Sequence, residues 1–216
     1  MNPMKEPGPG ESGTLGLRER NKLEKAQRIK AAAKELFTEL GYDSATMRDI
    51  AHRAHVGLGT LFNYVDDKRD LVFLVYIDDL NKVQQTAIKG VKPRASLLEQ
   101  LVSFFSHLYE EFASNPTLAR ILLRELTFYH HGRLSVDFQQ NRLRVVKSIE
   151  ELVAAAQEKK HIQTRESAAT IALGLFFVYA GAVRLWIADD NPNVKLGLSR
   201  LRKQFKIYIN GLGPAA

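Results

Sequence analysis

The sequence predicts an all-α protein, and three observations support this fold class. Apolar residues return at intervals of three and four along most of the chain, which is the spacing of one face of an α-helix. Glycine, proline or a short polar segment separates each such stretch from the next. No window shows sustained alternation of apolar and polar residues, the pattern typical of a β-strand.

Four helices are expected in the first part of the chain, over residues 22–40, 47–54, 58–65 and 68–89. Gly41 follows the first of them, at the position where a left-handed glycine commonly ends a helix. Thr46 and Asp49 have the spacing of a capping box at the start of the second. Asp66 and Asp67 precede the fourth and can cap it. The apolar stripe of the first helix consists of Ala26, Ile29, Ala33, Leu36, Phe37 and Leu40.

Gly90 and Pro93 break the chain, and further helices are expected beyond them. They run over about 95–113, 117–129, 135–160, 166–188 and 194–210. The chain is thereby divided into a tail (1–17), a small three-helix domain (18–66), a connecting helix (67–90) and a larger helical bundle (91–216). The tail is expected to be disordered, because it is rich in glycine and proline and lacks the apolar core of a signal peptide.

The composition excludes several classes of site and favours a polyanionic partner. The 216 residues include no cysteine, which excludes a disulfide framework, a cysteine nucleophile and a thiolate zinc site and fits a cytoplasmic protein. The net charge of +7 suits the binding of a polyanion. Between Arg18 and Lys34 lie 7 basic residues against 2 acidic ones, although a solvated helix face explains such a run equally well.

One segment, residues 168–188, is long and apolar enough to suggest a membrane span. It lies between charged helices, however, and Arg184 would fall inside the apolar zone. A helix that is buried or lies at a dimer interface explains the segment better, so no membrane partner is expected.

Residues 46–65 predict a helix-turn-helix, a motif that inserts its second helix into the major groove of DNA. The turn His55-Val56-Gly57 has the length that joins two crossed helices. Val56 of this turn, together with Leu61 and Val65, can face inward. The outward side and its flanks are left to Leu58, Gly59, Thr60, Phe62, Asn63 and Tyr64.

These outward residues have the chemistry that contact with DNA requires. Asn63 can pair with adenine, and the small residues Gly59 and Thr60 permit close approach to the groove. Thr60 and Tyr64 can donate hydrogen bonds to phosphate. Lys68, at the start of the next helix, adds a positive charge and a helix N-terminus for phosphate. Double-stranded DNA is therefore the expected partner.

The basic residues ahead of the first expected helix allow two interpretations. Arg18, Arg20 and Lys22 could enter the minor groove as an arm. A frayed, solvated tail is at least as good an explanation, and both are left open.

A longer pattern around the motif is more specific than the motif alone. The pattern is Ala33-x-x-Leu36-Phe37-x-x-x-Gly41-Tyr42-x-x-x-Thr46-x-x-x-Ile50-Ala51-x-x-Ala54-x-Val56-x-x-Gly59-Thr60-Leu61-Phe62-x-Tyr64-x-x-x-Lys68-x-x-Leu71. It resembles the DNA-binding domain of the TetR family of regulators. The resemblance implies an Ω-shaped homodimer whose three N-terminal helices bind DNA and whose C-terminal body dimerises and binds a small effector. By position it implies phosphate contacts from Thr46, Thr60 and Lys68, with Arg48 and residues 58–64 in or beside the groove.

Four positions depart from the pattern of that family. His55 stands where the family usually has glycine, and Gly57 stands where serine or another N-cap is common. Gly57 is the weaker cap by a few tenths of a kcal/mol to roughly 1 kcal/mol. Phe62 replaces a tyrosine and lacks its hydroxyl, and Val65 replaces a final aromatic residue. These departures bear on which operator is recognised and leave the expected fold unchanged.

The C-terminal bundle offers candidate effector-binding residues. A bundle that holds a ligand needs a cavity with a few polar groups inside it. Polar residues on otherwise apolar faces are His107, Glu125, Tyr129 and Tyr179. Each alone is better explained by an ordinary structural role. As a set they suggest a mostly apolar effector, aromatic or cationic in part, bound among them.

The last two helices are the expected homodimer interface, because they combine small residues that allow close approach with large apolar ones. The small residues are Gly174, Ala180, Gly181 and Ala182, and the large ones are Leu173, Phe177 and Trp186. A dimer built this way has two-fold symmetry, which predicts a palindromic operator.

No residue pattern supports an enzyme, a metal site or a bound cofactor. His130 and His131 are adjacent, so their rings point to different sides of a helix, and no phosphate-cradling glycine loop occurs. The expected function is a repressor that its effector releases from the operator, by moving the connecting helix and changing the spacing of the two DNA-binding domains. The alternative is an effector-binding helical protein that binds DNA without sequence preference.

Overall fold

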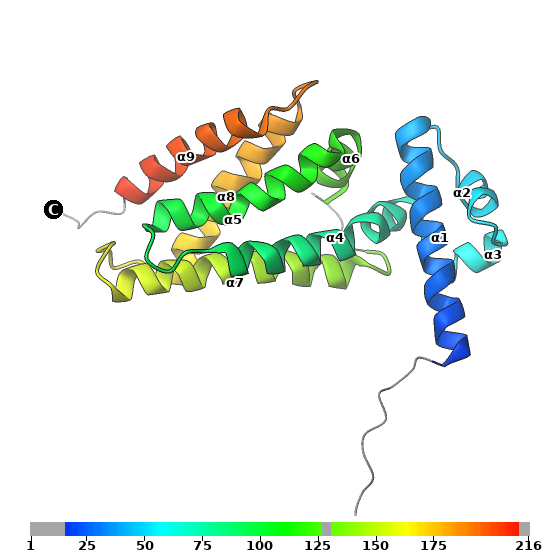
Figure 1. Ribbon diagram of the computed structural model, residues 1–216, viewed down its shortest axis with the longest axis horizontal. Coiled ribbons are helices and arrows are strands. Elements are labelled where there is room, and N and C mark those ends of the chain that lie inside the picture. The colour runs from blue at the N-terminus through cyan, green and yellow to red at the C-terminus, as the bar shows by residue number, and fades with distance from the viewer. Residues whose placement is uncertain (1–15, 127–130, 212–216) are drawn as a thin grey trace, which may run out of the picture.

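The structure, a computed structural model, describes residues 16–126 and 131–211, and every regular element within these ranges is an α-helix. The all-α prediction is confirmed. The helices are α1 (Leu17–Glu39), α2 (Met47–Arg53), α3 (Leu58–Leu61), α4 (Lys68–Gly90), α5 (Leu97–Ser114), α6 (Pro116–Glu125), α7 (Ser135–Glu158), α8 (Ala168–Ile187) and α9 (Val194–Gly211) (Figure 1).

The molecule is elongated, with a small head at one end and a longer helical body (Figure 1). The head consists of α1, α2 and α3, and α4 runs from it into the body, where it packs against α5 and α7. α8 packs against α7 and α9, and α5 contacts both α4 and α9. α6 is the helix of the body that reaches back to α1, so the head is joined to the body through α4 and α6.

A shared core holds the three helices of the head together. The α1 stripe predicted from the sequence is buried at Ile29, Ala33, Leu36 and Phe37, whereas Leu40 follows the helix and is exposed. The buried residues that meet this stripe from α2, α3 and their flanks are Ala45, Ile50, Ala51, Ala54, Leu61 and Val65. The two short helices therefore depend on α1 for their apolar contacts, since helices of this length are not stable alone.

Three predicted helix caps in and beside the head are confirmed. Gly41 takes a left-handed φ of +79° directly after Leu40, the C-cap residue of α1. Thr46 and Asp49 form both bonds of a capping box, in which each residue's side chain accepts from the other's backbone N–H at 3.2 Å. Asp67 caps α4 by accepting from the backbone N–H groups of the two residues that follow Lys68.

The start of α1 differs from the prediction. The helix begins at Leu17 and not at residue 22, so Arg18, Arg20 and Lys22 are helical, and neither an extended arm nor a frayed tail describes them. The prediction rested on the apolar stripe, which is absent from this segment. Its arginine, lysine, glutamate and leucine residues are nonetheless strong helix formers, and this propensity extends the helix.

Two other helices end earlier than expected. α3 ends at Leu61, because the next residues close tight turns in which the Asn63 and Tyr64 N–H groups bond to carbonyls three residues back. Val65 is buried all the same, as predicted. α6 ends at Glu125, whereas the prediction carried it to residue 129, and residues 127–130 lie outside the described ranges.

Aromatic side chains fill the centre of the body. Tyr179 of α8 stacks on Phe105 of α5 with ring centroids 4.1 Å apart, and Trp186 lies 4.4 Å from Tyr109. Gly197 lets α9 approach this cluster, because a Cβ there would lie 2.6 Å from Trp186 and 2.7 Å from Tyr109. The expectation that Trp186 contributes area to a dimer interface is therefore wrong, since its side chain is buried inside the subunit.

The turn of the helix-turn-helix contains a strained residue. His55 adopts a left-handed φ of +52°, a conformation that costs a residue with a Cβ about 1–2 kcal/mol. Glycine avoids this cost but gains freedom in the unfolded chain, which offsets part of the benefit. We expect His55→Gly to raise the free energy of unfolding by about 0.5–1 kcal/mol, measured by urea denaturation followed by circular dichroism.

Gly41→Ala is the reciprocal control. Gly41 is also left-handed, and nothing lies within 4 Å of a Cβ added there, so only backbone strain changes. We expect the free energy of unfolding of this variant to be about 1 kcal/mol lower than that of the wild-type protein. A loss of stability in His55→Gly, together with the expected loss in Gly41→Ala, would show that His55 is not strained.

Candidate nucleic-acid interface and ligand cavity

The second helix of the helix-turn-helix, with the turn after it, presents a small exposed surface. Its exposed residues are Gly59, Phe62 and Asn63, and its half-buried edges are Leu58, Thr60 and Tyr64. A Cβ added at Gly59 would meet no atom within 4 Å, so the surface is open at that point. The Thr60 hydroxyl and the Asn63 carboxamide form no hydrogen bond with the described residues, which leaves both available to another molecule.

α2 adds two residues at the edge of this surface. Arg48 is exposed and forms no ion pair with any described residue. Thr46 is exposed too, but its hydroxyl lies 2.5 Å from the Asp49 carboxylate. The hydrogen bonds from Thr46 lower the pKa of Asp49, so this carboxylate stays ionised. Thr46 therefore has a structural role in the start of α2, and its phosphate contact remains a prediction.

The Tyr64 hydroxyl has a partner inside the protein. It donates to the backbone carbonyl of Lys22 in α1 at 3.1 Å. A phenol has a single proton, so this bond takes the place of the expected donation to a phosphate. The bond fixes the end of the helix-turn-helix against the N-terminal half of α1.

Lys68 is also engaged inside the head. Its ammonium donates to the carbonyls of Tyr42 at 2.7 Å, Asp43 at 3.2 Å and Ala45 at 3.1 Å, and it lies 4.6 Å from the centre of the Tyr42 ring. An ammonium has three donors, and all three are used. Lys68 thus ties the connector between α1 and α2 to the start of α4, and a phosphate contact would require it to give up these bonds.

α6 brings the body into contact with the same connector. Arg124 lies 5.1 Å from the centre of the Tyr42 ring and 3.8 Å from the Asp43 carboxylate. Glu125 accepts a hydrogen bond from Arg124 at 2.9 Å. Burial, together with the negative charge of Glu125, raises the pKa of Tyr42 to about 12. Glu125, expected in a ligand site, lies instead at the contact between head and body.

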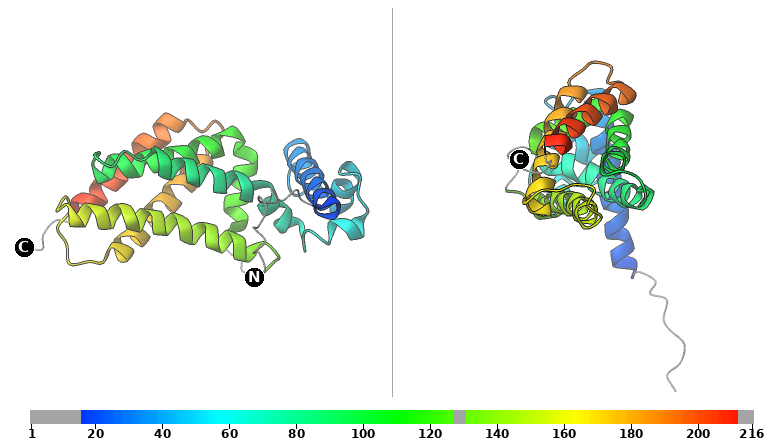
Figure 2. Two further views of the ribbon diagram at one scale, coloured as in Figure 1. Left: turned by 60° about the horizontal axis from the view of Figure 1, so that its bottom comes forward. Right: turned by 90° about the vertical axis from the view of Figure 1, so that its left-hand side faces the viewer.

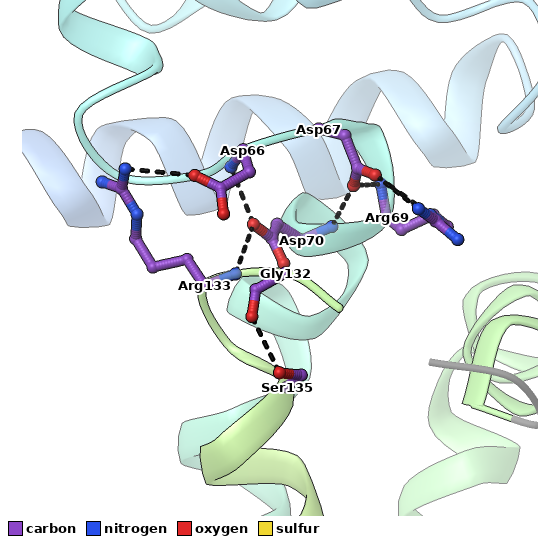
Figure 3. Close-up of polar contacts among 7 residues, drawn as sticks. All are labelled: Asp66, Asp67, Arg69, Asp70, Gly132, Arg133 and Ser135. Carbon is purple, nitrogen blue, oxygen red and sulfur yellow. Dashed lines mark hydrogen bonds and ion pairs between the residues drawn. The ribbon is translucent and has the colours of Figure 1, made fainter. Parts of the chain in front are cut away.

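A second contact joins the body to the head at the start of α4 (Figure 3). The Asp70 carboxylate is fully buried and accepts from the backbone N–H groups of Asp66 at 2.7 Å and of Arg133 at 3.2 Å. The Arg133 guanidinium donates to the Asn63 carbonyl and forms an ion pair with Asp66 at 3.1 Å. Arg133 lies between α6 and α7, so this loop is bonded directly to the end of the helix-turn-helix.

A cavity of about 290 Å³ lies in the body between α4, α5, α6, α7 and α8. Polar side chains line it from two helices: Gln139, Asn141 and Arg142 from α7, and Tyr179 and Arg184 from α8. Arg184 donates to the Ala180 carbonyl at 2.9 Å, whereas Arg142 is exposed and forms no ion pair with the described residues. The apolar part of the wall includes Leu80, Leu108, Phe112, Leu122, Phe138 and Val145.

The four predicted effector-binding residues do not lie together. Tyr179 lines the cavity, and its burial raises the pKa of its hydroxyl. His107 lies in the groove between α4 and α5, beside Gly90, and Glu125 lies at the head. These two residues therefore do not share the cavity with Tyr179, since a polar residue on an apolar face also serves contacts between helices. Tyr129 lies outside the described residues.

The sequence did contain a signal for the cavity residues that were missed. Phe138, Asn141, Arg142 and Val145 follow one another at steps of three, one and three, which places them on one face of α7. Two of the four are apolar and two polar, so the face has no clear character when the sequence is considered alone. Only the packing of α7 against its neighbours shows that this face borders a cavity.

α8 carries an apolar stripe that no described residue covers. Leu173, Phe177 and Leu185 are 44%, 62% and 81% exposed, and Gly181 completes the stripe at steps of four residues. Of the described helices, α8 alone has the length and apolar character of a membrane span. Gly174 serves the subunit's own packing, because a Cβ there would lie 2.0 Å from the Tyr208 hydroxyl of α9. Gly174 was expected to let two subunits approach each other closely, but it lets α8 and α9 of the same subunit approach instead.

Comparison with known proteins identifies the N-terminal part of the chain. Residues 29–75 match the family model described as bacterial regulatory proteins, tetR family. The chain is 42% identical over 59 residues to the HTH-type transcriptional regulator SAB2452 of Staphylococcus aureus, a match that covers 27% of this chain and 32% of the relative. It is 32% identical over 78 residues to the HTH-type transcriptional regulator HbdR of Aromatoleum sp., covering 36% and 34%. The matches thus span about a third of the length of these curated relatives.

Solved structures share the fold over most of the chain. FadR of Thermus thermophilus, a TetR family transcriptional repressor in complex with lauroyl-CoA, superposes with a TM-score of 0.69 at 22% identity, over 88% of this chain and 96% of that one. FadR of Bacillus subtilis in complex with stearoyl-CoA gives a TM-score of 0.68 at 18% identity, over 86% and 98%. At this level of identity the likeness concerns the fold, including the helical body that the sequence matches do not reach.

The three bonds of Lys68 lead to a prediction about the stability of the head. We expect Lys68→Met to lower the free energy of unfolding by about 1.5–3 kcal/mol, because hydrogen bonds from a charged donor contribute about that much and the carbonyls are left without it. Thermal and urea denaturation measure the loss.

Lys82→Met is the matched control, since Lys82 is an exposed lysine of the same helix whose ammonium forms no bond with the described residues. It should change stability by no more than about 0.5 kcal/mol. Equal stabilities for the two variants would mean that the bonds of Lys68 contribute nothing.

Proposed function

We propose, from the match of residues 29–75 to the tetR family of bacterial regulatory proteins, that the chain is a ligand-controlled repressor of that family that binds a palindromic operator as a homodimer. The observation that carries the proposal is the loop between α6 and α7. This loop adjoins the helices that line the cavity and is bonded, through Arg133, to the end of the helix-turn-helix. A ligand in the cavity thereby has a physical route to the DNA-binding surface.

The proposed DNA-binding surface reads base edges with α3 and the turn that follows it. Asn63 pairs with adenine and Phe62 contacts the methyl group of thymine, while Gly59 leaves room for the groove. Tyr64 and Lys68 support the surface from within through their bonds to α1 and to the connector. The full set of proposed contact and support residues is Thr46, Arg48, Leu58, Gly59, Thr60, Phe62, Asn63, Tyr64 and Lys68.

A second copy of the chain is the proposed cover for the exposed stripe of α8. Stripes this apolar are costly to leave in water, and at about 25 cal/mol per Å² the burial of such area drives association. Exposed apolar residues of α9, Leu196 and Ile207, extend the surface. A two-fold dimer through α8 and α9 places two heads side by side, which is the geometry that a palindromic operator requires. A cytoplasmic location follows from this function.

The proposed ligand is an apolar chain with an anionic group. The cavity wall is mostly apolar, and the charged side chains on it are the two arginines Arg142 and Arg184. These cations argue against the cationic effector that the aromatic residues alone suggested. Fatty acyl thioesters of coenzyme A belong to the favoured class, and two structures with the same fold contain lauroyl-CoA and stearoyl-CoA.

Selection of bound DNA from a random pool is the test of the function. We expect a single palindromic sequence, protected in footprinting and released by an acyl-CoA. Binding that depends strongly on salt but prefers no sequence would instead favour the alternative, a ligand-binding protein with non-specific DNA affinity. That alternative has one observation on its side, since the N-cap of α3 is Gly57, which supplies no side-chain cap.

Filling the cavity should block the ligand and spare the operator. Ala180 lines the cavity wall, so Ala180→Phe places a ring where the ligand must lie. We expect acyl-CoA affinity to fall by about tenfold or more, which corresponds to about 1.4 kcal/mol, with operator affinity unchanged. Ala154→Phe, at an exposed position of α7 away from the cavity, should leave both affinities as they were. Unchanged acyl-CoA binding in Ala180→Phe would place the ligand elsewhere.

Removing the Arg133 side chain should weaken the response to ligand. Couplings between two sites are typically 1–3 kcal/mol, so a saturating ligand lowers operator affinity by about 5- to 150-fold. In Arg133→Ala we expect this factor to fall at least about fivefold while the protein still binds ligand. The factor is measured by fluorescence anisotropy on an operator duplex with and without acyl-CoA. Arg200→Ala, an exposed arginine of α9, is the control, and an equal factor in both variants would exclude Arg133 from the coupling.

A further inference from the structure

α1 extends beyond the part of the head that it supports. Its first residues, 17–25, are helical and exposed, and Figures 1 and 2 show this end of the helix projecting past α3. α1 packs against α2, α4 and α6, but all of its buried residues lie from Ile29 onward. Apart from the Lys22 carbonyl, which accepts a hydrogen bond from Tyr64, the described residues leave the projecting end exposed, and its composition indicates a further role.

One face of α1 changes character along its length. The core-facing stripe contains Ile29, Ala33 and Leu36, all of which are buried, and α1 packs against α2, α4 and α6. Counting back from Ile29 in steps of four, three and four along the same face gives Lys25, Lys22 and Arg18. The face is therefore apolar where the head covers it and basic where it projects. We call these three residues the basic stripe.

The position of the basic stripe relative to α3 is fixed by one hydrogen bond. The Tyr64 hydroxyl donates to the Lys22 carbonyl at 3.1 Å, which holds the middle of the stripe against the end of the helix-turn-helix. Tyr64 directly follows Asn63, one of the exposed residues of the proposed reading surface. The basic stripe thus lies beside that surface and continues it outward.

The charges of the basic stripe are not neutralised within the subunit. Arg18, Lys22 and Lys25 form no ion pair with the described residues, whereas Lys30, farther along α1, pairs with Asp78 at 3.4 Å. Glu19 lies near Lys22 on the helix surface but forms no ion pair with it, so the stripe keeps a positive excess. A cationic face held beside a DNA-binding surface fits the phosphate backbone.

We propose that the basic stripe of α1 is a second DNA-contacting surface, which binds backbone phosphates flanking the sequence that α3 reads. The proposal rests on the proposed function. It adds a contact to the phosphate backbone, which does not depend on the base sequence. The minor groove is not the site, because an α-helix with its side chains is about 10–12 Å wide and the groove of B-DNA about 6 Å. The operator complex accordingly covers more DNA than the palindrome alone.

The salt dependence of binding tests the proposal directly. Each phosphate contact that is lost reduces the slope of log K against log salt concentration by about 0.9. For the triple variant Arg18→Ala, Lys22→Ala and Lys25→Ala we expect the slope on a duplex with long flanks to become shallower by up to about 2.7 per head. Alanine favours the helix, so circular dichroism should show α1 retained.

The matched control removes three cations from other faces of the same helix, by Arg20→Ala, Arg28→Ala and Lys34→Ala. This control variant should change the slope by less than about 0.9, the amount that one phosphate contact contributes. Equal slopes for both triple variants, or no change in either, would overturn the proposal by showing that only net charge matters or that α1 does not contact DNA. The conservative variant Arg18→Lys, Lys22→Arg and Lys25→Arg should keep the wild-type slope.

A shortened duplex separates this proposal from the proposed function. On DNA trimmed to the palindrome, the basic-stripe variant and the wild-type protein should have the same slope, since the flanking phosphates are gone. If the wild-type protein prefers no sequence, the operator proposal fails, and the comparison of slopes on a random duplex still decides whether the basic stripe binds phosphate. A difference between the variants that persists on the trimmed duplex would contradict the flanking position.

Discussion

The buried Asp70 carboxylate is the interaction on which the arrangement of head and body depends. It accepts backbone hydrogen bonds from the turn before α4 and from the loop between α6 and α7, so it holds two distant segments of the chain at one point. A buried carboxylate that lost these donors would be strongly destabilised. Both segments must therefore stay in place together or move together.

This constraint gives the loop between α6 and α7 its importance. The guanidinium of Arg133 extends the same junction to the Asn63 carbonyl, at the end of the recognition segment, while Arg124 of α6 holds the connector between α1 and α2. The head thus contacts the body at both ends of the helix-turn-helix. A shift of α6 and α7 around a ligand is transmitted to the head as a change in its orientation, because its short helices have too little core of their own to absorb it.

The sequence predicted the parts of this architecture that depend on local chemistry. The α1 stripe from Ile29 to Phe37, the left-handed Gly41, the capping box of Thr46 and the Asp67 cap all follow from residue type and spacing, and these are confirmed. The left-handed His55 shows that the backbone of the turn is retained even where glycine is absent. In that sense the turn is set by the packing of the two helices on α1 and not by the residue inside it.

The sequence was less informative where a residue's role depends on tertiary contacts. Nothing local distinguishes Tyr179, which lines the cavity, from His107, which does not. Lys68 and Tyr64 have the chemistry of DNA contacts, yet their donors are taken up by carbonyls that lie 23 or more residues away in the chain. The start of α1 was missed for the opposite reason, because helix propensity extends it without any apolar pattern.

The most direct test of the account is the thermodynamic linkage between the cavity and the DNA-binding surface. Calorimetric titration gives the affinity for the acyl thioester proposed as ligand, first with the free dimer and then with the dimer saturated by its operator. The account predicts weaker ligand binding in the operator complex, by the same factor by which the ligand weakens operator binding. Equal ligand affinities in the two titrations would contradict it, since a ligand that binds both states alike shifts neither.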